Sequence, residues 1–585
     1  MSLSLLEQLN GERAVILLYL VRIILSTPIA LFPEASSLLF LSLFALSVEI
    51  SADDASNPLA HTFKTRPGAS SGIFLGAVTL PGLLVSRLIQ TLRAESLQGV
   101  GIEEFEYLKL QYWAAAASCL SVLIFLSIKY QQQRRSINSI CSLSTWNTLY
   151  SFTGIILLIV FSFLSLSGKL YGVNPDILVS PQRVVFSLDV ILGVHSWTGS
   201  NHINSEDPLH VPCMCFHRES FLVTTGLVIY FGDMTAYTAS NIPYLASSNL
   251  IFVQNGFKRS EISTIIQGMI IGLLLFPVFY KYVLRIWEYL VSMCRSGDLG
   301  NNEMRRSLVF YALVTFMVVI VPSWMQFVHA FHVHPLLWVF DFVLSEPLRR
   351  LALCIYWLVI ISVSVRRFYN ISKNSKTERI LLRKYYHLMA VSIFVPALIF
   401  QPKFLDLAFG AALAVFLLLE IIRASPHGTV WKVWPLGHLV HQFMNAFTDH
   451  RDSDLLVVSH FSLLLGCAIP IWLSSGFTDR PLAPFAGILS LGIGDTMASM
   501  VGHKYGVLRW SKTGKKTIEG TAAGITSVLA ACFLLLPLLA ATGYIFTMHW
   551  FSLIVAVTIS GLLEAYTAQL DNAFIPLIFY SLLCL

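Results

Sequence analysis

The sequence predicts an all-α polytopic integral membrane protein, a bundle of roughly 13 to 17 transmembrane helices by the rule that about 20 apolar residues span a bilayer. Its composition indicates this class, because 55% of the 585 residues are hydrophobic and only 12% are charged. The mean hydropathy is +0.69. Soluble domains carry about 25% charged residues, so a soluble globular fold is excluded.

Apolar runs follow one another along most of the chain, which is the second observation. The clearest runs are residues 110–128, 145–168, 262–287, 307–327, 386–401, 404–423, 455–475 and 521–545. Less regular runs lie at 14–32, 36–50, 69–90, 219–250, 349–365, 482–502 and 548–585, and the longest of them have room for two passes.

Basic residues concentrate in the segments 131–135, 366–384 and 503–516. Lysine and arginine accumulate on the cytosolic side of membrane proteins, so these segments are predicted to face the cytosol. An even number of predicted spans separates 384 from 503, which agrees with this orientation. The loop 423–454 is predicted to lie on the same side.

The chain divides near residue 366. Residues 1–365 are predicted to be an N-terminal transmembrane bundle with few intramembrane charges, which shapes a lipid groove. Residues 366–585 contain the polar patterns that indicate chemistry, and they are predicted to be the catalytic transmembrane region.

The densest polar pattern starts at an acid and continues with small residues that fall close to one face of a helix: Asp495, Ala498, Gly502 and Gly506. A second cluster follows, with Lys515, Lys516, Thr517, Glu519 and Gly520. Small residues at this spacing also bring membrane helices together, so helix packing is the alternative interpretation. The acid and the lysines favour a nucleotide site, because lysines bind phosphates and carboxylates hold the accompanying Mg²⁺.

This pattern is not a Walker A loop. That loop needs a glycine, four residues and then Gly-Lys-Ser/Thr. Here Gly514-Lys515 is followed by Lys516, and Arg509 occupies the position of the first glycine. A different phosphate-binding arrangement is therefore predicted.

The whole pattern resembles the CTP-binding motif of the dolichol kinases. It reads Asp495-xx-Ala498-xxx-Gly502-xxx-Gly506, then eight residues, then Lys515-Lys516-Thr517-x-Glu519-Gly520. The resemblance implies CTP-dependent phosphorylation of the terminal hydroxyl of dolichol or a polyprenol. The product would be dolichyl phosphate, the lipid carrier for protein glycosylation and GPI-anchor synthesis. The resemblance also implies a multi-pass protein of the endoplasmic reticulum membrane whose active site faces the cytosol. The partners it implies are CTP, Mg²⁺ and membrane lipids, and no nucleic acid.

Three more segments resemble the same family, and the third is the stretch from Glu564 to Asp571 near the C-terminus. Arg383, Lys384 and His387 match an Arg-Lys-x-x-His signature, although a basic stop at a cytosolic helix end would also explain the two cations. Asp449 and Asp452 lie in an acidic segment that is otherwise explained as a solvated loop.

The resemblance implies roles for these residues. CTP contacts are expected from the small residues and lysines of the motif and from Arg383 and Lys384. Expected Mg²⁺ ligands are Asp495, Glu519, Asp449 and Asp452. The general base is left open among His387, Asp495 and Asp449.

Glu564 and Asp571 are ionisable residues in the last apolar stretch, where such groups are costly and usually functional. Their spacing predicts that both lie on one helix face as a second acidic pair.

Three other functions fit parts of the pattern. One is a kinase for another isoprenoid alcohol such as phytol, and another is a CTP-using lipid cytidylyltransferase. The third is a transporter in which Asp495, Glu564 and Asp571 couple ion and substrate movement.

Overall fold

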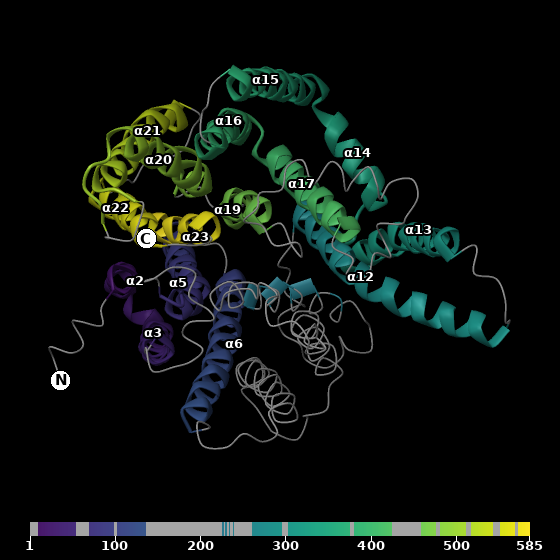
Figure 1. The fold of residues 1–585 in the computed structure, drawn as a ribbon, viewed down its shortest axis with the longest axis horizontal. Helices are drawn as coiled ribbons and strands as arrows, with labels where there is room; N and C mark the ends of the chain where they lie inside the picture. Colours follow the sequence, from purple (N-terminus) through teal and green to yellow (C-terminus); the bar gives the residue numbers. More distant parts are fainter. Residues whose placement is uncertain are drawn as a thin grey trace. The chain divides into compact units, whose positions relative to one another are not determined.

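The structure is a computed structural model. It describes residues 10–53, 70–98, 102–135, 260–294, 302–374, 379–423, 458–474, 480–510, 516–541, 550–567 and 571–585, with a few positions between 225 and 238. These residues are almost entirely helical (Figure 1), and they include no β-strand beyond an isolated bridge between Arg509 and Thr517. Helices satisfy the backbone hydrogen bonds within one segment, which a chain in hydrocarbon requires. The predicted all-α class is confirmed.

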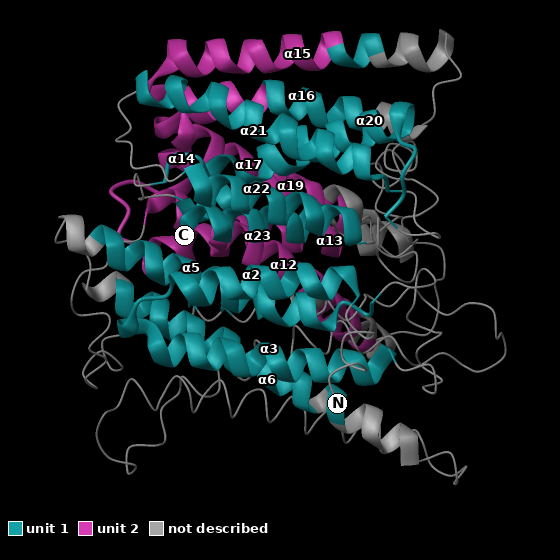
Figure 2. Cartoon of the chain, turned by 90° about the vertical axis from the view of Figure 1, so that its left-hand side faces the viewer, with its two compact units in different colours: residues 1–257, 364–392, 469–585 teal, residues 258–363, 393–468 magenta. Residues whose placement is uncertain are grey.

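The chain forms two compact units, coloured separately in Figure 2. Unit 1 consists of Met1–Phe257, Ser364–Ser392 and Ile469–Leu585, and unit 2 of Lys258–Val363 and Ile393–Ala468. The helices wholly within unit 1 are α2 (Gly11–Ser26), η1 (Ile29–Leu31), α3 (Phe32–Asp53), α5 (Ile73–Gln98), α6 (Ile102–Arg135), η4 (Ala483–Phe485), the π-helix η5 (Ile488–Asp495), α20 (Thr496–Tyr505), α21 (Ile518–Ala541), α22 (Trp550–Tyr566) and α23 (Asp571–Cys584).

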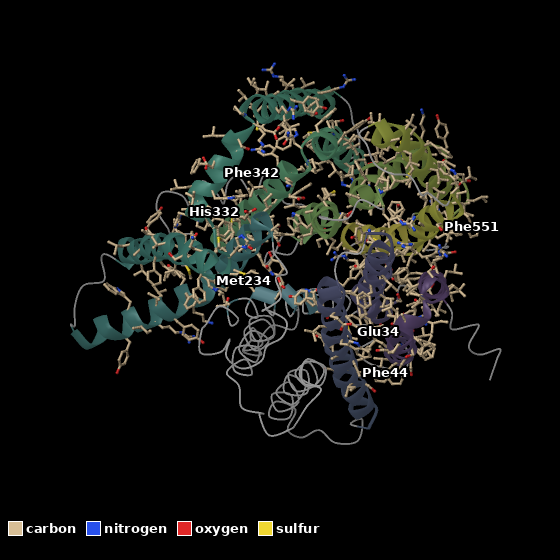
Figure 3. The ribbon with its side chains drawn as sticks, turned by 180° about the vertical axis from the view of Figure 1, so that it is seen from behind. Glu34, Phe44, Met234, His332, Phe342 and Phe551 are labelled. Atoms are coloured by element: carbon tan, nitrogen blue, oxygen red, sulfur yellow. The ribbon has the colours of Figure 1, made fainter. Side chains whose placement is uncertain are left out.

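Unit 2 contains α12 (Glu261–Cys294), α13 (Asn302–Val328), α14 (Pro335–Ser345) and α17 (Pro402–Arg423), with α12 packed on α13 and α17. Three helices contribute residues to both units: α15 (Pro347–Asn374), α16 (Arg379–Phe400) and α19 (Val458–Ser474). In unit 2, the Arg350 guanidinium lies 4.1 Å from the centre of the ring of Phe342, which is labelled in Figure 3. Arg350 is buried, and this cation–π contact gives its charge a partner among apolar helices.

Seven of the described helices are long and apolar enough to cross a membrane, and five shorter apolar helices accompany them. The predicted runs at 262–287, 307–327 and 404–423 fall within α12, α13 and α17. The last predicted run, 548–585, contains α22 and α23. The run at 145–168 lies outside the described residues, so the number of spans over the whole chain stays a prediction.

The N-terminal helices of unit 1 bury more charge than the apolar runs suggest. Arg13 on α2 is 6% exposed and donates to Glu49 on α3, with Nε and Oε1 2.8 Å apart. Glu34, labelled in Figure 3, is fully buried and accepts a hydrogen bond from the Trp113 indole of α6 at 3.1 Å. Paired in this way, buried charges can be retained in an apolar bundle.

The predicted acidic pair near the C-terminus is wrong as a shared helix face. Glu564 belongs to α22, which ends at Tyr566, whereas Asp571 begins α23. The two residues belong to different helices, so their spacing of seven does not place them on one helix face.

Candidate active site

The structure brings the Arg-Lys-x-x-His signature to the aspartate that begins the motif. Lys384 and His387 lie three residues apart on α16 and therefore share a face. The Lys384 ammonium forms an ion pair and hydrogen bond with Oδ2 of Asp495 at the end of η5. Nδ1 of His387 lies 3.3 Å from the same oxygen. Two segments separated by 111 residues thus converge on one carboxylate.

This cluster is largely shielded from solvent, with Asp495 9% exposed and His387 8% exposed. The second neighbour of His387 Nδ1 is the carbonyl oxygen of Leu491, 3.2 Å away. Both neighbours of Nδ1 can only accept hydrogen bonds, so Nδ1 carries a proton. In the neutral form of the ring, Nε2 is then the nitrogen that can accept a proton.

The backbone that carries Asp495 is a π-helix, Ile488–Asp495, followed directly by α20. Such widened turns are rare and frequently occur at functional sites. The Oγ of Ser499, one turn further on, donates to Oδ1 of Asp495 at 3.4 Å. Asp495 is therefore held by side chains from both α16 and α20.

Ala498 and Gly502 lie on the face of α20 that packs against α21, and Gly506 follows α20 as its C-cap in an extended conformation. A Cβ on Gly502 would lie 2.8 Å from Oγ1 of Thr517, and one on Gly520 would lie 2.6 Å from the carbonyl oxygen of Ala498. Gly506 is equally close, since a Cβ there would lie 2.6 Å from Oγ1 of Thr517. The small residues therefore allow close helix packing, as the alternative interpretation expected. Their contribution to nucleotide binding stays a prediction.

Hydrogen bonds within the connection between α20 and α21 hold its two ends together. The Ile518 amide donates to the Leu508 carbonyl at 2.8 Å, and the Trp510 amide donates to the Lys516 carbonyl at 3.2 Å. The Glu519 carboxylate accepts from the Leu508 amide at 3.0 and 3.2 Å. We call residues 506–510 and 516–519 the motif loop. Its hydrogen bonds fix the position of Lys516 relative to α20.

Lys516 reaches the C-terminal end of α22. Its ammonium donates to the Glu564 carbonyl and, at 3.2 Å, to the Thr567 carbonyl. The carbonyl end of a helix carries partial negative charge and attracts cations. The predicted phosphate-binding lysine therefore joins the motif loop to α22.

Sequence reasoning missed two aromatic residues beside Lys516. Trp510 and Tyr566 have ring centroids 5.2 Å apart, and the Trp510 indole donates to Oγ1 of Thr521 at 2.9 Å. Trp510 lies in the spacer between Gly506 and Lys515. The position of an aromatic residue inside a basic loop was the sequence signal that could have identified Trp510. No comparable sequence signal pointed to Tyr566.

A magnesium ion carried by a nucleotide fits Asp495. Mg²⁺ in nucleotide sites is bound by one or two carboxylates together with phosphates and water. Within the described ranges, no three His, Cys, Asp or Glu side chains come together as a metal site. Glu519 is hydrogen-bonded to the motif loop. Asp495 is therefore the described carboxylate that we consider for such an ion, and its role as a Mg²⁺ ligand stays a prediction.

Three predicted site residues lie outside the described residues, namely Asp449, Asp452 and Lys515. Arg383 lies within α16, where only its backbone is described. Their predicted roles stay predictions.

Comparison with known proteins decides the family. The dolichol kinase of Arabidopsis thaliana, EVAN, is 55% identical over 578 residues, which is 98% of this chain and 98% of EVAN. The chain therefore belongs to the dolichol kinase family. The family model, described as dolichol kinase, matches residues 245–523. No solved structure matches.

More distant members of the family match over shorter stretches. Human dolichol kinase is 31% identical over 334 residues, 54% of this chain and 57% of its own length. The Saccharomyces cerevisiae dolichol kinase is 31% identical over 246 residues, 42% of this chain and 43% of its own. The stretch matched by the family model contains Lys384, His387, Asp495 and Lys516.

Proposed function

We propose that this protein transfers the γ-phosphate of CTP to the terminal hydroxyl of dolichol, at a site built around Asp495. Family membership supports the kinase activity, since each relative named above is a dolichol kinase. The convergence of Lys384 and His387 on Asp495 is the observation that supports this location for the active site. A phytol kinase, a cytidylyltransferase and a transporter are not favoured by these relatives.

His387 is our candidate for the general base. As the hydroxyl oxygen of dolichol forms its bond to the γ-phosphorus, the bond from that phosphorus to the β–γ bridging oxygen breaks and CDP leaves. The hydroxyl proton passes to Nε2 of His387, the nitrogen that faces away from Asp495 and the Leu491 carbonyl. Asp495 orients the ring and stabilises the imidazolium that forms.

Cations supply the remaining stabilisation, because phosphoryl transfer depends mainly on positioning and charge neutralisation. Lys384 and Lys516 are our candidates for phosphate contacts. Mg²⁺, when bound, neutralises charge on the phosphate oxygens, and Asp495 is its candidate protein ligand. CTP rather than ATP as the donor rests on the resemblance of the motif.

We place the protein in the endoplasmic reticulum membrane with this site facing the cytosol. Lys384 ends the basic segment 366–384, and Asp495 is followed by the basic segment 503–516. Basic segments stay on the cytosolic side. CTP supplied outside sealed microsomes should therefore be used without detergent. A requirement for detergent would contradict the orientation.

Asp495→Asn tests the site. The amide keeps the size of the side chain but removes the charge that Lys384 and His387 face, so kcat is expected to fall by about 100-fold or more. The rate of dolichyl phosphate formation would be measured on purified protein at equal membrane accumulation. The matched control is Asp406→Asn on α17, because both aspartates are 9% exposed. Wild-type turnover by Asp495→Asn would overturn the assignment.

A further inference from the structure

Helix α2 lies along a helix of the proposed catalytic region. The Arg22 guanidinium, near the end of α2, donates to Oγ of Ser552 near the start of α22 at 2.8 Å. At the opposite ends of these helices, Gly11 contacts Tyr566. The two contacts show that α2 and α22 run antiparallel, and both helices belong to unit 1.

The contact at Gly11 leaves no room for a side chain. A Cβ there would lie 2.6 Å from Cζ of the Tyr566 ring and closer still to two other ring carbons. Real Cβ atoms essentially never approach other atoms within 3.0 Å. Gly11 is the first residue of α2, so alanine fits its helical backbone, and the three atoms nearest to its Cβ all belong to the Tyr566 ring.

Tyr566 connects this contact to the motif loop. Its ring faces Trp510, whose indole donates to Thr521 and whose amide donates to the Lys516 carbonyl. The carbonyls on either side of Tyr566, from Glu564 and Thr567, accept from the Lys516 ammonium. A movement of Tyr566 therefore acts on Lys516 through both its backbone and its side chain.

We propose that Gly11 and Tyr566 are positioning residues for the nucleotide, through which α2 holds the motif loop and Lys516 in their binding geometry. The proposal rests on the proposed function, since it assigns the motif loop to CTP. It also gives the N-terminal region a role at the nucleotide site, although α2 lies before residue 245, where the family-model match begins. A small misplacement of a positioning group can reduce catalytic efficiency by about 10- to 100-fold.

Gly11→Ala is the direct test, read as separate kcat and KM values for CTP at saturating dolichol. We expect KM for CTP to rise about tenfold with kcat changed by less than about twofold, because the variant weakens binding rather than chemistry. Loss of folded protein alone would lower the apparent kcat and leave KM unchanged. Gly226→Ala is the matched control, since a Cβ at Gly226 meets no atom of the described part of the chain within 4 Å.

Variants of Tyr566 distinguish an effect of its aromatic ring on CTP binding from a general loss of folded protein. Tyr566→Phe keeps the ring and is expected to keep KM for CTP near the wild-type value, whereas Tyr566→Leu is expected to raise it as Gly11→Ala does. When Gly11→Ala is combined with Tyr566→Leu, it should have less effect than alone, because the ring it displaces is gone. An unchanged KM in both Gly11→Ala and Tyr566→Leu would overturn the inference. A wild-type protein that phosphorylates no dolichol would instead overturn the proposed function.

Discussion

Asp495 determines how the other groups of the proposed site are held. Its buried carboxylate needs partners, because an unpaired charge in a low-dielectric surrounding is strongly destabilising. Lys384 and His387 provide them from α16, and Ser499 provides a weaker contact from α20. The spacing of Lys384 and His387 could be read from the sequence as one helix face. Their pairing with Asp495, which lies 111 positions after Lys384, could not, because hydropathy does not indicate which helices meet.

His387→Gln tests the assignment of the base at this scale. Glutamine can still donate to Asp495 or to the Leu491 carbonyl, but it cannot accept a proton from the dolichol hydroxyl. We expect kcat to fall by about 10²- to 10⁴-fold, the usual contribution of a general base. Steady-state rates of dolichyl phosphate formation by purified protein measure this effect.

A histidine elsewhere supplies the control for this experiment. His332, labelled in Figure 3, is exposed between α13 and α14 of unit 2. His332→Gln should keep the wild-type kcat. If His387→Gln also kept it, the base would have to be sought among the other two candidates, Asp495 and Asp449.

At the scale of elements, the small residues of the motif allow α20 to pack closely on α21. Figure 1 shows these helices together with α22. The sequence predicted that the small residues share a face, and it left open whether that face meets a ligand or a helix. The structure shows that it meets α21. The π-helix before α20 and the hydrogen bonds of the motif loop have no hydropathy signal, so sequence patterns could not predict them.

Gly520→Ala tests this packing. Its Cβ would lie 2.6 Å from the Ala498 carbonyl, and backbone cannot move aside as a flexible side chain can. We expect the variant to lose about 1–3 kcal/mol of stability, the usual cost of overpacking. Thermal unfolding of the purified protein in detergent measures it, with Ala522→Val at an exposed position of α21 as the control. Equal melting temperatures for Gly520→Ala and wild type would show that α20 and α21 are not packed this closely.

For the whole molecule, composition and apolar run lengths were enough to predict an all-α membrane protein. The described helices confirm that class, with seven candidate spans among them. The grouping of helices was not predictable in the same way. Helices from the two ends of the chain, α2 and α22, lie together in unit 1. The functional division at residue 366, with an N-terminal lipid groove, stays a prediction.

The central claim is that the protein moves the terminal phosphate of CTP onto dolichol. The most direct measurement incubates the purified protein with dolichol and Mg²⁺, and with CTP labelled at either the γ- or the α-phosphate. We expect the lipid product to carry the γ-label and none of the α-label, with CDP as the second product. Appearance of the α-label in lipid with release of pyrophosphate, or no labelled lipid from either nucleotide, would contradict the account.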